Sequence, residues 1–82
     1  MYINICKNVI LKSEDIIGIF KVDGEIEKNQ ELIEKLEQGR NIEDLSDGNK
    51  KSLILYMKDG VEKGIYSSIS SASLGKKKEI IN

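Results

Sequence analysis

The chain has no histidine and only one cysteine among its 82 residues, and both shortages exclude kinds of functional site. Without histidine there is no serine–histidine or cysteine–histidine nucleophile pair. One cysteine cannot form an intramolecular disulfide or supply the ligands of a structural zinc site. The sequence also lacks a glycine-rich nucleotide fingerprint and a phosphate loop that opens a helix. We therefore expect a protein that is not an enzyme and that uses no cofactor.

Long apolar runs are absent as well. No stretch of about 18 apolar residues occurs, so the sequence predicts no transmembrane helix. The N-terminus lacks the basic and then apolar order of a signal peptide. Cys6 lies in an apolar segment, where a small buried thiol is expected, and an unpaired thiol fits a reducing compartment. These features predict a cytoplasmic location and no membrane partner.

The size of the chain predicts one domain, residues 1–82, that forms a homo-oligomer. A domain this small buries only about 60 % of its unfolded surface, so it gains stability by joining copies of itself. The formal net charge is −1, which neither favours nor excludes a nucleic acid partner. The charges are separated along the chain, however. Residues 25–47 carry eight carboxylates and three cations, whereas residues 48–82 carry seven lysines and three carboxylates.

Three apolar segments in the first part of the chain predict strands. Residues 2–5 and 8–11 are typical of two short strands with a brief connection. Residues 16–21 form an uninterrupted apolar run rich in β-branched side chains, which predicts a strand buried on both faces. Gly18 leaves a gap in this strand, so we expect a backbone or a large side chain to lie close to it.

Residues 25–38 predict the one long helix. Ile26, Ile33 and Leu36 recur at helical spacing, and charged side chains occupy the opposite face. The apolar stripe is narrow, so this helix covers a sheet or another helix on one side only. Gly39 follows the helix and is the expected left-handed residue at its C-terminus.

The strongest hairpin signal is Asp59-Gly60, which lies between the apolar segments 53–57 and 61–66. An Asp-Gly pair favours a two-residue type I′ turn, in which both residues have positive φ. The resulting register pairs Ile54 with Ile65 and Tyr56 with Lys63. We expect the other face of the hairpin to be the core face, formed by Leu53, Leu55, Met57 and Tyr66.

The remaining segments predict a loop and a short helix. Residues 41–52 are expected to be a loop with a turn at 46–49. Ser70 is the predicted N-cap of a short helix through Lys78. The elements together predict an α+β domain with a small, mostly antiparallel sheet, one amphipathic helix and a short C-terminal helix.

Two lysine clusters are the candidate sites of phosphate binding. One is Lys50-Lys51 before the hairpin, and the other is Lys76-Lys77 with its neighbour Lys78. A lysine neutralises a phosphate as a point charge but does not read a base as an arginine fork does. Around a homo-oligomer, repeated lysine pairs would form a multivalent surface for phosphates. The alternative is that these lysines are solvated side chains that serve only solubility.

Other polar runs admit several interpretations. Glu43, Asp44 and Asp47 lack the ligand spacing of a calcium loop and are expected to form a solvated acidic loop. The hydroxyls of residues 67–73 could donate to phosphates, pack at a close subunit contact or cap a helix. Capping is the expected role of Ser70.

Short motifs along nearly the whole chain carry a family resemblance: Met1-Tyr2-Ile3, Asn8-Val9-Ile10, Asp15-Ile16-Ile17-Gly18-Ile19-Phe20, Ser46-Asp47, Lys51-Ser52 and Ser68-Ile69-Ser70-Ser71-Ala72-Ser73-Leu74. In this order and spacing they resemble the bacterial extracellular-matrix regulators RemA and RemB, and the RemB-type branch most closely. Resemblance to the RemA branch implies a DNA-binding regulator of biofilm-matrix genes that assembles into a ring-like homo-oligomer. The RemB branch is tied to the same regulation.

The sequence departs from the RemA pattern at two points. Asp15 stands where that branch has an arginine, and Asn49 and Lys50 stand where it has an arginine pair after a glycine. An aspartate repels phosphates, so the resemblance carries over only Lys50 and Lys51 as DNA-binding residues. Asp15 is expected to be a turn or strand-start residue, or a salt-bridge partner across a subunit interface.

The function expected from these observations is regulation of extracellular-matrix and biofilm gene expression. The protein would act in the cytoplasm as a homo-oligomer that binds DNA phosphates through its loop lysines, or that cooperates with another regulatory protein. The alternative is a scaffold or adaptor that does not bind DNA and acts through protein–protein contacts.

Overall fold

The computed structural model describes residues 2–22 and 30–80, and the side chains of the last helix up to Lys76. The described residues form two helices, a short 3-10 turn and two sheets, one of two strands and one of four. In chain order the elements are β1 (Tyr2–Cys6), β2 (Val9–Lys12), η1 (Ser13–Asp15), β3 (Ile16–Lys21), α1 (Gln30–Gln38), β4 (Ile42–Asp44), β5 (Ser52–Lys58), β6 (Val61–Ser67) and α2 (Ser71–Ile80).

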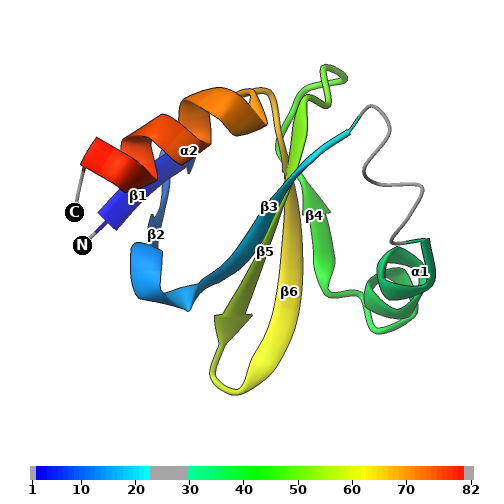
Figure 1. The fold of residues 1–82 in the computed structure, drawn as a ribbon. Coiled ribbons are helices and arrows are strands. Elements are labelled where there is room, and N and C mark those ends of the chain that lie inside the picture. Colours follow the sequence, from blue (N-terminus) through cyan, green and yellow to red (C-terminus); the bar gives the residue numbers. More distant parts are fainter. Residues whose placement is uncertain (1, 23–29, 81–82) are drawn as a thin grey trace.

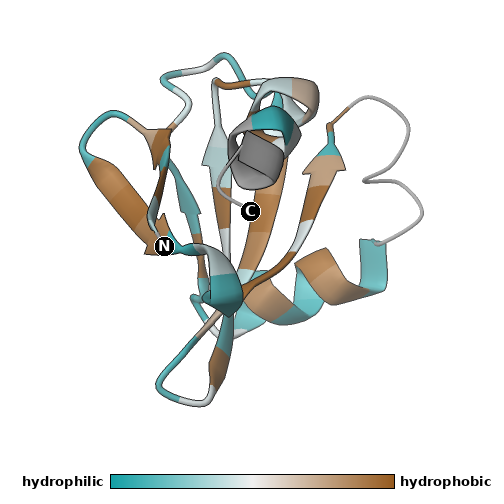
Figure 2. Ribbon diagram, turned by 60° about the vertical axis from the view of Figure 1, so that its left-hand side comes forward, coloured by the Kyte–Doolittle hydropathy of each residue, from teal (hydrophilic) through white to brown (hydrophobic). Residues whose placement is uncertain are grey.

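The four-stranded sheet, with strand order β3-β5-β6-β4, lies between two layers. Helix α1 lies on one side of it, and the β1–β2 hairpin with α2 lies on the other (Figure 1). Apolar segments are concentrated in the strands and hydrophilic ones in the connecting turns (Figure 2). The predicted α+β class is therefore confirmed. The sheet arrangement is mixed, because β4 runs parallel to β6 while every other strand pair is antiparallel.

The predicted hairpin is present as β5 and β6, and its register is the predicted one. Asp59 and Gly60 have φ of 52° and 78°, as a type I′ turn requires. The pairs Ile54–Ile65 and Tyr56–Lys63 also form. The prediction of its core face is correct only in part, because both faces of the hairpin carry buried residues. The main hydrophobic cluster includes hairpin residues of the opposite face. Its buried members are Ile3, Ile5, Ile16, Ile54, Tyr56, Ile65 and Leu74.

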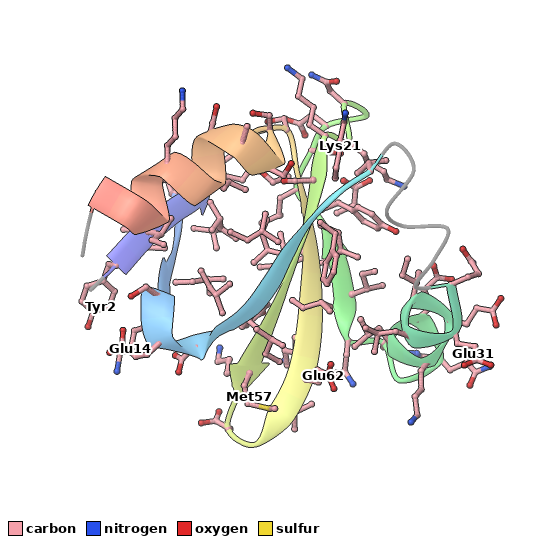
Figure 3. All side chains as sticks on the ribbon, in the orientation of Figure 1. Tyr2, Glu14, Lys21, Glu31, Met57 and Glu62 are labelled. Carbon is pink, nitrogen blue, oxygen red and sulfur yellow. The ribbon has the colours of Figure 1, made fainter. Side chains whose placement is uncertain are left out.

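The face predicted to be the core lies under α1. Leu53 and Leu55 are buried there, and a side chain at Gly64 would contact Leu53 and Leu36. Met57, by contrast, is 41 % exposed near the hairpin tip (Figure 3). Both faces of the hairpin are thus covered along most of its length. Local sequence patterns alone do not show which of the two faces packs into the main cluster.

Strand β3 lies at an edge of the sheet and is not buried on both faces, contrary to the prediction. It pairs only with β5, and the register shifts between Ile16 and Gly18. Ile17 is the extra residue of this bulge and is 53 % exposed. The expectation for Gly18 is confirmed. A Cβ at this position would lie 3.0 Å from two carbons of the Phe20 ring, so the ring covers the glycine.

The segment after α1 is not simply a loop. Ile42–Asp44 forms the short edge strand β4, which runs parallel to β6 and pairs Ile42 with Gly64. The predicted turn at 46–49 is present. Asp47 and Gly48 have φ of 54° and 84°, and the Asn49 amide donates to the Ser46 carbonyl at 3.1 Å. The strand was missed because three residues with one apolar side chain give no periodic signal.

Helix α1 begins at Gln30 and ends at Gln38, and the predicted helical residues 25–29 lie outside the described part of the chain. Ile33 and Leu36 are buried, as predicted. The left-handed residue after the helix is Arg40, with φ of 56°, and not Gly39. The Asn41 amide donates to the Leu36 carbonyl at 2.8 Å and the Arg40 amide to Glu37 at 3.1 Å, which is a Schellman motif. The left-handed residue therefore lies one position later than predicted.

Helix α2 has the predicted cap. The Ser70 hydroxyl accepts a hydrogen bond from the Ser73 amide at 3.2 Å, and the helix begins at Ser71. Leu74 from this helix is fully buried in the main cluster. Neither helix in the described part of the chain has the length and apolar character needed to cross a membrane.

Candidate phosphate-binding groove

Three segments meet at one end of the four-stranded sheet and form a groove of about 460 Å³. They are the end of β3, the loop before β5 and the start of α2. We call this the lysine groove and define it by its lining residues: Lys21, Val22, Asn49, Lys50, Lys51, Ser70, Ser71 and Ala72. Lys21 lies at the end of the sheet opposite Met57 (Figure 3).

Backbone hydrogen bonds fix the position of the loop in this groove. The Val22 amide donates to the Lys51 carbonyl at 3.2 Å, and the Lys51 amide donates to the Ser67 carbonyl at 2.9 Å. Lys51 is therefore held between the ends of β3 and β6. The side chains of Lys21, Lys50 and Lys51 are all exposed, as phosphate-binding residues must be.

The start of α2 completes the groove. Ser71 and Ala72 are the first two residues of this ten-residue helix, and their amides have no acceptor within the helix. The positive end of the helix dipole adds to the field of the lysines. A phosphate in the groove would therefore meet cationic side chains and hydrogen-bond donors together.

The Lys50 ammonium has two partners within the protein. It lies 4.5 Å from the centre of the Tyr66 ring, which is a cation–π contact, and 3.8 Å from Oδ2 of Asp44. Among the described residues, no hydrogen bond or ion pair involves the Lys51 side chain. The two neighbouring lysines thus differ, because Lys50 is already engaged and Lys51 is not.

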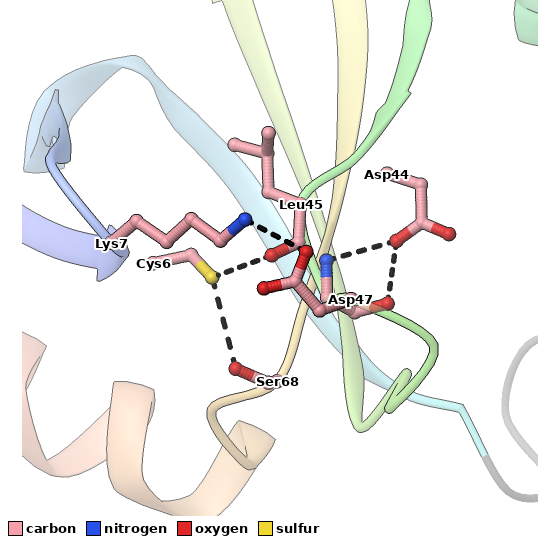
Figure 4. Close-up of polar contacts among 7 residues, drawn as sticks. Cys6, Lys7, Asp44, Leu45, Asp47 and Ser68 are labelled. Carbon is pink, nitrogen blue, oxygen red and sulfur yellow. Dashed lines mark hydrogen bonds and ion pairs between the residues drawn. The ribbon is translucent and has the colours of Figure 1, made fainter.

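Asp44 is held by the turn that follows β4. Its Oδ1 accepts hydrogen bonds from the Ser46 amide at 2.9 Å and from the Ser46 hydroxyl at 2.5 Å (Figure 4). These bonds from the Ser46 hydroxyl and amide lower the pKa of Asp44, and Lys50 lowers it further. Asp44 is therefore a charged and well-oriented carboxylate beside the groove.

A second ion pair ties the same turn to the β1–β2 hairpin. The Lys7 ammonium lies 2.8 Å from the Asp47 carboxylate, and the Asp47 contact raises the pKa of Lys7 (Figure 4). The buried Cys6 thiol donates to the Leu45 carbonyl at 3.0 Å. The Ser68 backbone amide lowers the pKa of this thiol, and burial opposes that change. These contacts link the β1–β2 hairpin to the segment between β4 and the lysines.

Of the three predicted site residues whose side chains are described, two lie in the groove. Lys50 and Lys51 line it, whereas Lys76 is exposed on α2 and is not among the lining residues. The side chain of Lys77 lies outside the described part of the structure. Lys21 was missed, since nothing local marks the last residue of an apolar strand as part of a site formed by distant segments. Asp15 does not weaken the groove, because it ends η1 at the opposite end of β3.

Among residues 2–22 and 30–80, no group of three or more Cys, Asp or Glu side chains is arranged to hold a metal ion. Asp44 at the end of β4 and Asp47 in the turn pair with different lysines, Lys50 and Lys7.

Comparison with models of known protein families gives no match for this chain, and comparison with proteins of curated function gives none either.

Proposed function

We propose that this protein regulates extracellular-matrix and biofilm genes in the cytoplasm, as a RemB-type relative of the RemA and RemB regulators. It acts as a homo-oligomer that contacts DNA phosphates through the lysine groove. The observation that carries the proposal is the meeting of Lys21, Lys50 and Lys51 with the start of α2 in one groove. Three cations beside helix amides favour a polyanion over a neutral ligand.

The groove suits backbone contact and not base recognition. Its cations are all lysines, which neutralise phosphates without the bidentate geometry that reads guanine. Target preference therefore comes from DNA shape, from repetition of the groove around an oligomer or from another regulatory protein. A single copy of the domain binds weakly.

A salt titration with labelled duplex DNA tests the proposal. Fluorescence anisotropy should give an affinity that falls steeply with salt, with the slope of log K against log [salt] shallower by about 1 in Lys51→Gln. Lys58→Gln is the matched control, because this exposed lysine lies at the other end of β5. Equal effects of the two substitutions would place the contact outside the groove. Native mass spectrometry tests assembly, and a stable monomer that binds no DNA would overturn the proposal.

A second function, that of a protein-binding scaffold or adaptor, is favoured by a separate surface. Tyr2 and Ile10 are 64 % and 57 % exposed, and with Met57 they are apolar residues that line a groove of about 390 Å³. Failure to bind DNA even at low salt, together with loss of assembly or partner binding in Ile10→Asp, would support this function.

A further inference from the structure

We infer that Asp44 is an internal competitor of phosphate, because its carboxylate occupies the Lys50 ammonium at the lysine groove. The inference rests on the proposed function and concerns the regulation of the same site. Oδ1 of Asp44 is fixed by two hydrogen bonds from Ser46, and Oδ2 lies 3.8 Å from the Lys50 ammonium. The turn therefore orients an anion at a cation that lines the groove.

The contact between Asp44 and Lys50 is one that a phosphate can displace. At 3.8 Å it is longer than the roughly 2.8 Å of a charge-assisted hydrogen bond, which the Lys7–Asp47 pair attains at 2.8 Å. The side chains of Lys50 and Asp44 are 47 % and 44 % exposed, so solvent and ligands reach both groups. A phosphate and the carboxylate thus compete for one ammonium group.

Tyr66 supports the Lys50 side chain whether or not Asp44 is charged. The Lys50 ammonium lies 4.5 Å from the centre of its ring, and this contact does not depend on the charge of Asp44. When Asp44 is neutralised, Lys50 keeps a support and presents an uncompensated charge. Asp44 thereby lowers the affinity for phosphates without being needed to place the lysine.

The test compares Asp44→Asn with Glu43→Gln in the full chain. Both substitutions remove one carboxylate from β4, but Glu43 pairs with Ile65 on the other face of the sheet, away from Tyr66. Asparagine at position 44 keeps an oxygen that accepts the Ser46 hydrogen bonds, so folding should persist, which a thermal melt checks. Anisotropy with duplex DNA at low salt should show two- to fivefold tighter binding for Asp44→Asn. The salt slope should also steepen by about 1. Glu43→Gln should change the affinity less.

A double-mutant cycle isolates the pair. In a Lys50→Gln background, Asp44→Asn should no longer tighten binding. The inference is overturned if Asp44→Asn acts no more strongly than Glu43→Gln, or if its effect survives the loss of Lys50.

A second probe separates this inference from the proposed function. Tripolyphosphate is titrated into the same variants and followed by NMR shifts of the Ser71 and Ala72 amides. DNA binding without an Asp44 effect would sink the inference and leave the function. Tripolyphosphate binding that responds to Asp44→Asn, without DNA binding, would sink the function and leave the inference. Absence of binding to both probes would sink both.

Discussion

Replacement of Ser67 by alanine should destabilise the domain more than the loss of one small hydroxyl group would suggest. Its hydroxyl is buried, donates to the Ile5 carbonyl and accepts from the Ile69 amide at 3.0 Å. Ser67 thereby joins β6 to β1 and to the connection that leads into α2. Each buried polar group that loses its partner costs about 1–3 kcal/mol, so the substitution should cost about 2–4 kcal/mol. A domain of this size has a total stability of roughly 4–12 kcal/mol.

Ser52 supplies a matched comparison. It pairs with Ser67 across the sheet and is equally buried, but its hydroxyl makes one hydrogen bond, to the Ile69 carbonyl at 2.7 Å. Ser52→Ala should therefore cost about 1–2 kcal/mol, near half the effect of Ser67→Ala. Because both hydroxyls contact the backbone of Ile69, the double substitution should not be additive.

Urea denaturation followed by circular dichroism measures these differences. With an m value of about 1 kcal/mol/M, Ser67→Ala should lower the midpoint by about 2 M or more, provided that m is unchanged. A loss of less than about 0.5 kcal/mol in Ser67→Ala would refute the reasoning, because surface substitutions commonly have effects of that size. A loss in Ser52→Ala that exceeds the loss in Ser67→Ala would also refute it.

Three further outcomes follow from the structure. Arg40→Gly should raise the free energy of unfolding by about 0.5–1 kcal/mol, because Arg40 has a positive φ of 56°, and Arg40→Ala should give no gain in the same urea assay. Leu74→Ala should cost about 2–5 kcal/mol in thermal or urea unfolding, because this side chain is fully buried in the main cluster. The pKa of Asp44 is lowered in the folded state, so its stabilisation is present above the ordinary pKa of about 4 and is lost as the pH falls through the folded-state pKa. The stability gap between wild type and Asp44→Asn should therefore close in acid, and a gap that widens would contradict this assignment.

Local chemistry predicted the parts of the fold that depend on neighbouring residues. Asp59-Gly60 determines a type I′ turn and hence the register of β5 with β6, and the Ser70 cap depends only on the amide three residues later. The contact of the Phe20 ring with Gly18 is also local, because residues two apart in β3 lie on the same face of the strand.

Features that depend on distant segments could not be predicted in this way. The main core lies on the Ile54 face because residues from both ends of the chain, Ile3 and Leu74 among them, cover it. The exposure of Ile17 results from a bulge in the pairing of β3 with β5. Strand β4 forms because its backbone pairs with β6, which is distant in the sequence. Lys50 and Lys51 could be proposed from the sequence because they are adjacent in it. The contribution of Lys21 and the start of α2 to their groove could not, because these segments are distant in the sequence and meet only in the fold.

The composition of the main cluster also determines when it can form during translation. Ile3 and Ile5 are made well before Leu74, which packs in the same cluster and is among the last of the described residues to be made. During translation the β1–β2 hairpin therefore has no completed partner and exposes its apolar side chains. The nascent chain should depend on chaperones or on rapid collapse once α2 has been made, and the β1–β2 hairpin is a vulnerable part until then.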